Sequence, residues 1–190
     1  QAIKRIQKSP KGEYYLTDAI SLAREDGSSI PSVTIRDPAE AMGINNRVHL
    51  AEAEAILRMR INRQWMLSGI TLEDPETIYI GTDVQLESDV TILANTHLNG
   101  KTTVAKGSVI GPNSVITDTA IGENCRVIAS YLESAILEEG VAMGPYCHLR
   151  SGAHLGPGVH MGNFGEVKNS HLGSGTKMGH FSYIGDAQIG

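Results

Sequence analysis

From Ile80 to Ile189 an aliphatic side chain recurs at every sixth residue, with an occasional step of five. Each of these lead positions holds Ile, Leu, Val or Met, and a glycine often follows, as at Gly144 and Gly179. Four residues after the lead there is often a small or β-branched side chain: Val84, Val90, Thr96, Thr102, Ser108, Ser114, Cys125, Cys147 and Ala153. This period predicts short parallel strands stacked into a β-helix solenoid, with successive coils about 4.8 Å apart.

The composition agrees with a solenoid better than with the competing fold, a sandwich of antiparallel strands. A sandwich predicts alternating polar and apolar residues with turn signals roughly every 8 to 12 residues, not a lead residue at every sixth position. Aromatic residues make up only 5% of the chain and there are 21 glycines, which suits a narrow aliphatic core with many tight corners. Cys125 and Cys147 fall in or beside this pattern and are interpreted as small apolar fillers rather than nucleophiles.

The segment before the repeats has a different pattern, and residues 1–47 are predicted as a mixed α/β segment. Thr17–Asp26 is a candidate helix opened by a capping Thr, and Ile30–Ile35 is a candidate strand. Arg47–Leu67 contains no Gly or Pro and is rich in good helix formers, so it predicts a long helix, with a solvated basic face formed by Arg58, Arg60 and Arg63. The predicted organisation is therefore residues 1–47, a linker helix over 48–68 and a solenoid over 69–190.

Charge and hydropathy exclude several classes of protein. A net charge of −5 argues against a nucleic-acid partner. No apolar run approaches the roughly 20 residues that a membrane helix needs, so stable membrane insertion is not expected. Two cysteines without a CxxC motif are typical of a reducing compartment, and the cytoplasm is predicted as the location.

Several motifs, in a fixed order along the chain, give a more specific interpretation: "GEYYLTD", "GINNR", the long helix, and repeats containing "GPYCHLRSGA", "GNFGEVKNS" and "KMGHFSYIGDAQIG". Together they resemble the bifunctional N-acetylglucosamine-1-phosphate uridyltransferase/glucosamine-1-phosphate acetyltransferase family. The resemblance implies a C-terminal part of an α/β nucleotidyltransferase (pyrophosphorylase) domain, then the helix, then a left-handed parallel β-helix. Three six-residue repeats would form each triangular coil. The left hand comes from the resemblance alone, since general rules favour the other hand.

The resemblance also implies the chemistry. Acetyl passes from acetyl-CoA to the amine of glucosamine-1-phosphate, and UTP then couples to N-acetylglucosamine-1-phosphate, which yields UDP-N-acetylglucosamine. Mg²⁺ is the implied cofactor, acetyl-CoA a co-substrate, and a homotrimer with acetyltransferase sites between subunits the implied assembly. The chain is expected to be a fragment that lacks both ends of such a protein and is inactive alone.

With three repeats per coil, residues about 18 apart lie side by side on adjacent coils. Arg150 and Lys168 have this spacing and should form a pair of neighbouring cations on one face. An anion is expected between them, and a planar guanidinium beside an ammonium suits a phosphate. Glu166 is the alternative partner. It shares the face with His148 and Tyr183.

His180 is predicted to border this cationic pair, at the corner that leads to Tyr183. Acetyl transfer requires the substrate ammonium to lose a proton, and an imidazole, with an ordinary pKa of about 6.5, suits that step at neutral pH. The resemblance assigns the general-base role to the His of "KxGHxxYxGD", which is His180. It places Arg150, Lys168 and Tyr183 around the sugar phosphate.

Two further sets of residues are candidates for metal binding. The resemblance makes Asn45, the first Asn of "GINNR", a ligand of Mg²⁺ and of the nucleotide sugar, and an amide oxygen is a suitable hard ligand. His148, His154 and His160 recur every six residues and should therefore fall on three different faces. A zinc site shared between subunits is the competing interpretation of these histidines.

Two other functions remain open from the sequence. In the first, a sugar nucleotidyltransferase uses its β-helix only for assembly, and would not need Arg150, Lys168, His180 and Tyr183 at one edge. In the second, the chain is a scaffold without enzymatic activity, which has no use for "GINNR".

Overall fold

The computed structural model describes residues 2–190, which divide into two compact units, residues 2–42 and 43–190. The first unit contains η1 (Ala2–Arg5), α1 (Asp18–Glu25) and η2 (Pro38–Ala41), and none of these elements has a buried residue. Arg5 joins η1 to the end of α1 through an ion pair of 2.6 Å with Asp26.

The α/β prediction for the N-terminal segment is wrong for the described residues 2–47, which contain helices and no strand. The candidate strand Ile30–Ile35 is exposed along its whole length. An extended segment becomes a strand only when a neighbour takes up its backbone hydrogen bonds, and none does so here. The helix predicted at Thr17–Asp26 is present as α1, although the Thr17 side chain makes no capping bond.

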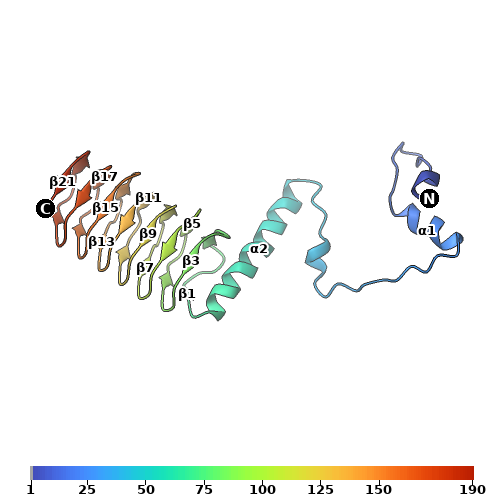
Figure 1. Ribbon diagram of the computed structural model, residues 1–190, viewed down its shortest axis with the longest axis horizontal. Helices are drawn as coiled ribbons and strands as arrows, with labels where there is room; N and C mark the ends of the chain where they lie inside the picture. The colour runs from blue at the N-terminus through green and yellow to red at the C-terminus, as the bar shows by residue number, and fades with distance from the viewer. Residues whose placement is uncertain (1) are drawn as a thin grey trace. The chain divides into compact units, whose positions relative to one another are not determined.

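The second unit begins with the long helix predicted from the sequence, α2 (Arg47–Leu67). The side chain of Asn46 caps it by accepting a hydrogen bond of 2.9 Å from the amide of His49. Its C-terminal half packs on the first coil of the solenoid (Figure 1), where the buried Asn62 donates to the carbonyl oxygens of Pro75 and Ile78. No helix in residues 2–190 is long and apolar enough to cross a membrane.

The expected solvated basic face of α2 does not hold at Arg58. Its side chain is only 15% exposed, and its guanidinium lies 4.4 Å from the centre of the Tyr79 ring. Because the long stem of Arg packs against apolar surface while the head finds an aromatic face, this residue joins the helix to the solenoid.

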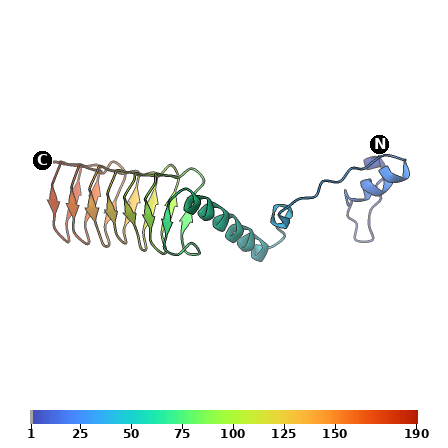
Figure 2. The same ribbon diagram turned by 90° about the horizontal axis from the view of Figure 1, so that it is seen from below.

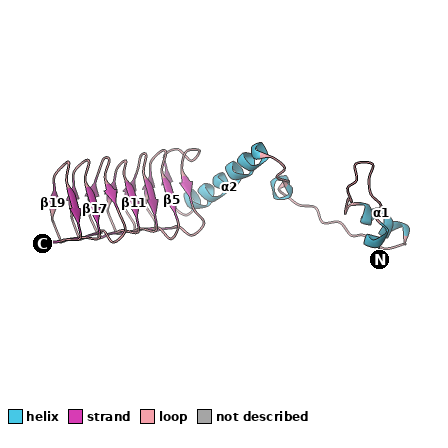
Figure 3. Ribbon diagram, turned by 90° about the horizontal axis from the view of Figure 1, so that it is seen from above, coloured by secondary structure: helices cyan, strands magenta, loops and turns pink. Residues whose placement is uncertain are grey.

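The solenoid predicted from the repeats is present as 21 short strands in three parallel sheets of seven, and each strand pairs with the third one along the chain. Figures 2 and 3 show the stacked coils from opposite sides. The first sheet contains β1 (Thr71–Leu72), β4 (Thr91–Ile92), β7 (Val109–Ile110), β10 (Arg126–Val127), β13 (Ala142–Met143), β16 (His160–Met161) and β19 (Lys177–Met178). The second sheet contains β2 (Tyr79–Ile80), β5 (His97–Asn99), β8 (Val115–Thr117), β11 (Tyr131–Glu133), β14 (His148–Leu149), β17 (Glu166–Lys168) and β20 (Tyr183–Gly185). The third contains β3 (Gln85–Leu86), β6 (Thr103–Val104), β9 (Ala120–Ile121), β12 (Ile136–Leu137), β15 (His154–Leu155), β18 (His171–Leu172) and β21 (Gln188–Ile189).

The core is a single aliphatic column formed by the predicted lead residues. Between Ile80 and Met178 every lead is buried except Leu86, which is partly buried. The small residues four places later are buried too, and their hydroxyls bond to the backbone: the Ser108 hydroxyl, for example, donates to Gly122 O and accepts from Cys125 N. Burial of each large lead contributes about 1.5–3 kcal/mol, so the column is the main source of stability.

Both cysteines fill small slots in this core. Cys125 is 1% and Cys147 3% exposed, and burial raises the pKa of both thiols above the ordinary value. A raised pKa leaves less thiolate at neutral pH, and thiolate is the reactive form. We therefore expect neither thiol to react with a thiol reagent such as dithionitrobenzoate in the native chain, and both to react in guanidinium. Rapid modification of either cysteine without denaturant would contradict the assignment as core fillers.

Candidate functional site

The predicted cationic pair lies on the outer surface of the second sheet. In the ladder from β14 through β17 to β20, His148 is paired with Glu166 and Glu166 with Tyr183, while the leads between them point inward. The amide of Arg150 donates a hydrogen bond of 2.9 Å to Val167 O, which puts Arg150 beside Lys168 on the next coil. The stacking expected from the 18-residue spacing is therefore present.

Glu166 forms an ion pair with Arg150, one of the two cations. Its carboxylate accepts a hydrogen bond of 3.1 Å from Arg150 Nη1, so the alternative partner predicted from the sequence is the one observed. Both side chains are well exposed, which makes this a weak ion pair that a ligand can replace. Lys168 forms no ion pair with any residue in 2–190, and its charge remains available.

His180 lies in the corner between β19 and β20, three residues before Tyr183, where β20 begins. The imidazole is exposed and stands edge-on to the Phe181 ring, with ring centres 5.9 Å apart. Tyr183 is 61% exposed on the outer face of β20. Arg150, Lys168 and Tyr183 thus share the outer surface of the second sheet, and His180 lies on the corner that enters it.

A stack of aromatic rings at the same corner was missed by the sequence interpretation. Tyr146, Phe164 and Phe181 lie above one another, with ring centres 5.3 and 5.0 Å apart and nearly parallel planes. Each has positive φ and is substantially exposed. Their spacing of 18 and 17 residues, one coil each, is a signal that could have identified the stack. The stack gives His180 an apolar neighbour, the Phe181 ring.

Asn45 is not brought near these residues. It precedes the start of α2, the end of that helix that extends away from the coils, whereas His180 and Tyr183 belong to the coil of β19, β20 and β21 at the other end of the solenoid (Figure 1). The neighbouring Asn46 serves as the helix cap, and the backbone N–H of Asn45 donates to His49 Nδ1 at 3.4 Å. The side chain of Asn45 offers one amide oxygen to a ligand. That fits Mg²⁺ only in a partial role, because this ion takes few protein ligands together with phosphates and water.

The other histidines are separated as the spacing predicted. His148, His154 and His160 lie on the second, third and first sheets respectively. His154 lies 2.6 Å from a Glu138 carboxylate oxygen, and His148 lies 3.3 Å from Glu133. Residues 2–190 contain no group of three His, Cys, Asp or Glu side chains that could hold a metal ion.

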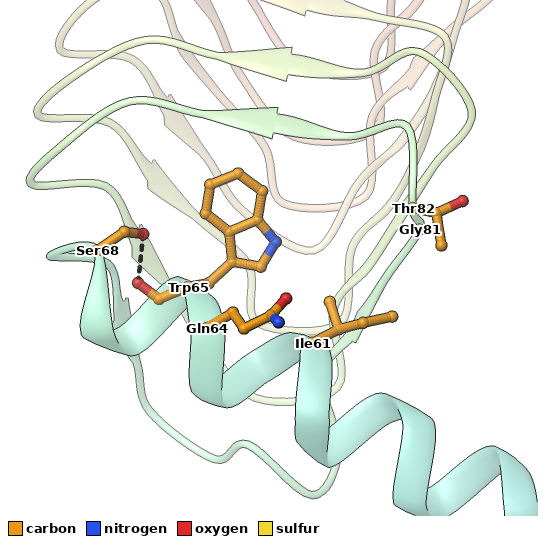
Figure 4. Close-up of a pocket in the computed structure, with 6 residues that line it drawn as sticks. All are labelled: Ile61, Gln64, Trp65, Ser68, Gly81 and Thr82. Carbon is orange, nitrogen blue, oxygen red and sulfur yellow. Dashed lines mark hydrogen bonds between the residues drawn. The ribbon is translucent and has the colours of Figure 1, made fainter. Parts of the chain in front are cut away.

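A hollow of about 360 Å³ lies elsewhere, between α2 and the first coil. Figure 4 shows Trp65, Gln64 and Ile61 on the side of the helix that faces the coils, with Gly81 and Thr82 nearest to Ile61. Figure 4 marks the hydrogen bond of 2.8 Å that the Ser68 hydroxyl donates to Trp65 O. Without charged or catalytic groups, this hollow is a packing feature of the helix junction.

Comparison with known proteins agrees with the resemblance. Residues 83–118 match the family model described as bacterial transferase hexapeptide (six repeats). The bifunctional protein GlmU of Streptococcus thermophilus is 44% identical to this chain over 191 aligned residues, which cover the whole chain. The chain resembles GlmU along its whole length. GlmU from Streptococcus agalactiae is 41% identical over the same span.

The chain spans 42% of the length of these GlmU proteins. Two solved structures are more distant. GDP-perosamine N-acetyl transferase from Caulobacter crescentus is 20% identical, with a TM-score of 0.30, over 70% of this chain and 62% of that one. A hexapeptide transferase family protein from Anaplasma phagocytophilum is 18% identical, with a TM-score of 0.26, over 62% of this chain and 74% of that one. These likenesses carry no argument about the site.

Proposed function

We propose that the solenoid is the acetyltransferase part of a GlmU-like bifunctional enzyme, and that it transfers acetyl from acetyl-CoA to the amine of glucosamine-1-phosphate. The observation that carries this proposal is the gathering of Arg150, Lys168 and Tyr183 on one sheet surface with His180 at its entry corner. The similarity to GlmU over the entire chain supports the choice of substrates.

In the proposed mechanism the phosphate binds at Lys168 and displaces Glu166 from Arg150, because a dianion can bond to both cations. The Tyr183 hydroxyl donates to the same phosphate. The His180 imidazole accepts a proton from the substrate ammonium, and the free amine attacks the thioester carbonyl carbon. The carbon–sulfur bond then breaks, the attacking nitrogen gives up its second proton to the departing sulfur, the amide remains on the sugar, and CoA leaves as the thiol.

The test uses a chimaera in which this chain replaces the matching segment of Streptococcus thermophilus GlmU. The chimaera should acetylate glucosamine-1-phosphate in the presence of acetyl-CoA. If it folds and forms UDP-N-acetylglucosamine from UTP but does not acetylate, the solenoid serves assembly, and the alternative of a nucleotidyltransferase with a structural β-helix is correct.

Lys168→Ala in this chimaera should weaken the binding of glucosamine-1-phosphate about 10- to 100-fold, because a hydrogen bond to a charged group contributes about 1.5–3 kcal/mol. Isothermal titration calorimetry measures the Kd directly. Lys177→Ala is the matched control, since Lys177 is an exposed lysine of β19 on the first sheet. Equal affinities for the two variants would mean that the cations serve Glu166 rather than a phosphate.

We further propose that the parent protein carries the uridylyl transfer of the bifunctional family, with UTP and N-acetylglucosamine-1-phosphate as substrates. Asn45 would offer its amide oxygen to Mg²⁺ and the nucleotide sugar, and the other ligands would be phosphate oxygens, water and residues outside this chain. The proposed assembly is a homotrimer in the cytoplasm, with each acetyltransferase site between two subunits.

A further inference from the structure

Gly185 lies under the ring of Tyr183. Both residues point outward from β20, because side chains two places apart share one face of a strand. A Cβ added to Gly185 would lie 2.8 Å from Tyr183 Cζ and 2.9 Å from Cε1, and closer still to the hydroxyl oxygen. The phenol therefore covers the place that a side chain at position 185 would occupy.

The backbone gives no reason for a glycine at this position. The φ of Gly185 does not lie in the left-handed region. In the ladder of the second sheet Gly185 pairs with Lys168, and the equivalent places on earlier coils hold Arg150, Glu133 and Thr117. Since four side chains are accommodated in this row, the position tolerates a Cβ, and it is the Tyr183 ring that excludes one.

Two tyrosines at the same row of the sheet show what the glycine permits. Tyr131 is followed two places later by Glu133, and its ring stands edge-on to the His148 ring of the next coil, with ring centres 5.3 Å apart. Tyr79 is followed by Gly81, but its ring is held between His97 and Arg58, and a Cβ on Gly81 would meet nothing closer than 3.4 Å. Only Tyr183 uses the space above the glycine.

The direction of the ring matters for the proposed site. Because the phenol lies along β20, its hydroxyl is carried over Gly185, whose register partner is Lys168. No hydrogen bond to the Tyr183 hydroxyl is found among residues 2–190, so the group is free to donate to a ligand. We propose that Gly185 is a positioning residue that lets Tyr183 lie flat and direct its hydroxyl to the phosphate held by Lys168 and Arg150. This inference rests on the proposed function.

The experiment is a double-mutant cycle in the chimaera, read as the KM for glucosamine-1-phosphate. Tyr183→Phe and Gly185→Ala should each raise KM about tenfold, with kcat within about threefold of the parent. Because both remove one interaction, Gly185→Ala should add less than about threefold in the Tyr183→Phe background. Gly81→Ala is the matched control from the same Tyr-Ile-Gly sequence and should leave KM unchanged.

Three outcomes would overturn the inference: an unchanged KM for Gly185→Ala, an unchanged KM for Tyr183→Phe, or fully additive effects. The first, found with Tyr183→Phe still raising KM, would leave the proposed acetyltransferase intact. Should Gly185→Ala lower the unfolding temperature, the same substitution must cost no stability in a Tyr183→Ala background. A loss of stability that persists there would show that the Cβ meets something other than the phenol, and the inference would fail.

Discussion

His180→Ala is expected to lower the acetyltransferase kcat of the chimaera by about 10²- to 10⁴-fold, the range that positioned general bases contribute. The substrate amine is protonated at neutral pH and cannot attack until a base removes a proton. His180 is the histidine at the corner that enters the surface shared by Arg150, Lys168 and Tyr183. The measurement is steady-state release of CoA thiol with both substrates saturating.

His160→Ala is the control, because that histidine lies on the first sheet, away from the cationic surface. It should leave kcat within about twofold, and neither substitution should alter uridylyl transfer. A His180→Ala rate within a factor of about 3 of the parent would rule out the general-base role. Because His180 is exposed, the variant should fold as well as the parent.

Gly144→Ala should destabilise the chain by about 3 kcal/mol. Gly144 has a φ of +102°, where a side chain is strained, and its added Cβ would collide with Ile128 O of the adjacent coil. Strain of this kind costs about 1–2 kcal/mol and overpacking about 1–3 kcal/mol more. Thermal unfolding followed by circular dichroism should show a fall of several degrees.

Gly158→Ala separates the two contributions. Gly158 also has positive φ, +65°, but a Cβ there would meet nothing within 4 Å. It should therefore cost only the backbone strain, about 1 kcal/mol. Equal losses for the two variants would show that the close approach between coils at Gly144 contributes nothing to the requirement for glycine.

The solenoid could be predicted from the sequence because its periodicity is carried by every coil. The leads and the small residues that follow them are repeated so often that no single exception, such as the partly buried Leu86, obscures the pattern. The long helix was equally clear, since residues 47–67 contain nothing that would end it. The proximity of Arg150 and Lys168 followed from counting residues once three repeats per coil were assumed.

The parts that could not be predicted depend on side-chain contacts or on missing partners. The segment at Ile30–Ile35 has the composition of a strand but no neighbouring strand. The packing of Arg58 on Tyr79 joins residues from a helix and a strand that the sequence gives no reason to pair. The ion pair of Arg150 with Glu166 was left open because both a phosphate and a carboxylate satisfy the same cation.

The construction of the fold also bears on how its surface chemistry can change over time. The outer surface that holds Arg150, Lys168 and Tyr183 spans three successive coils, and each coil bonds only to the coils next to it. Gain or loss of one whole coil before β11 would renumber these residues without moving them relative to one another. A single residue inserted between Arg150 and Tyr183 would instead shift the strand register within the site and separate these side chains. This stretch should therefore tolerate far less variation in length than the coils that precede it.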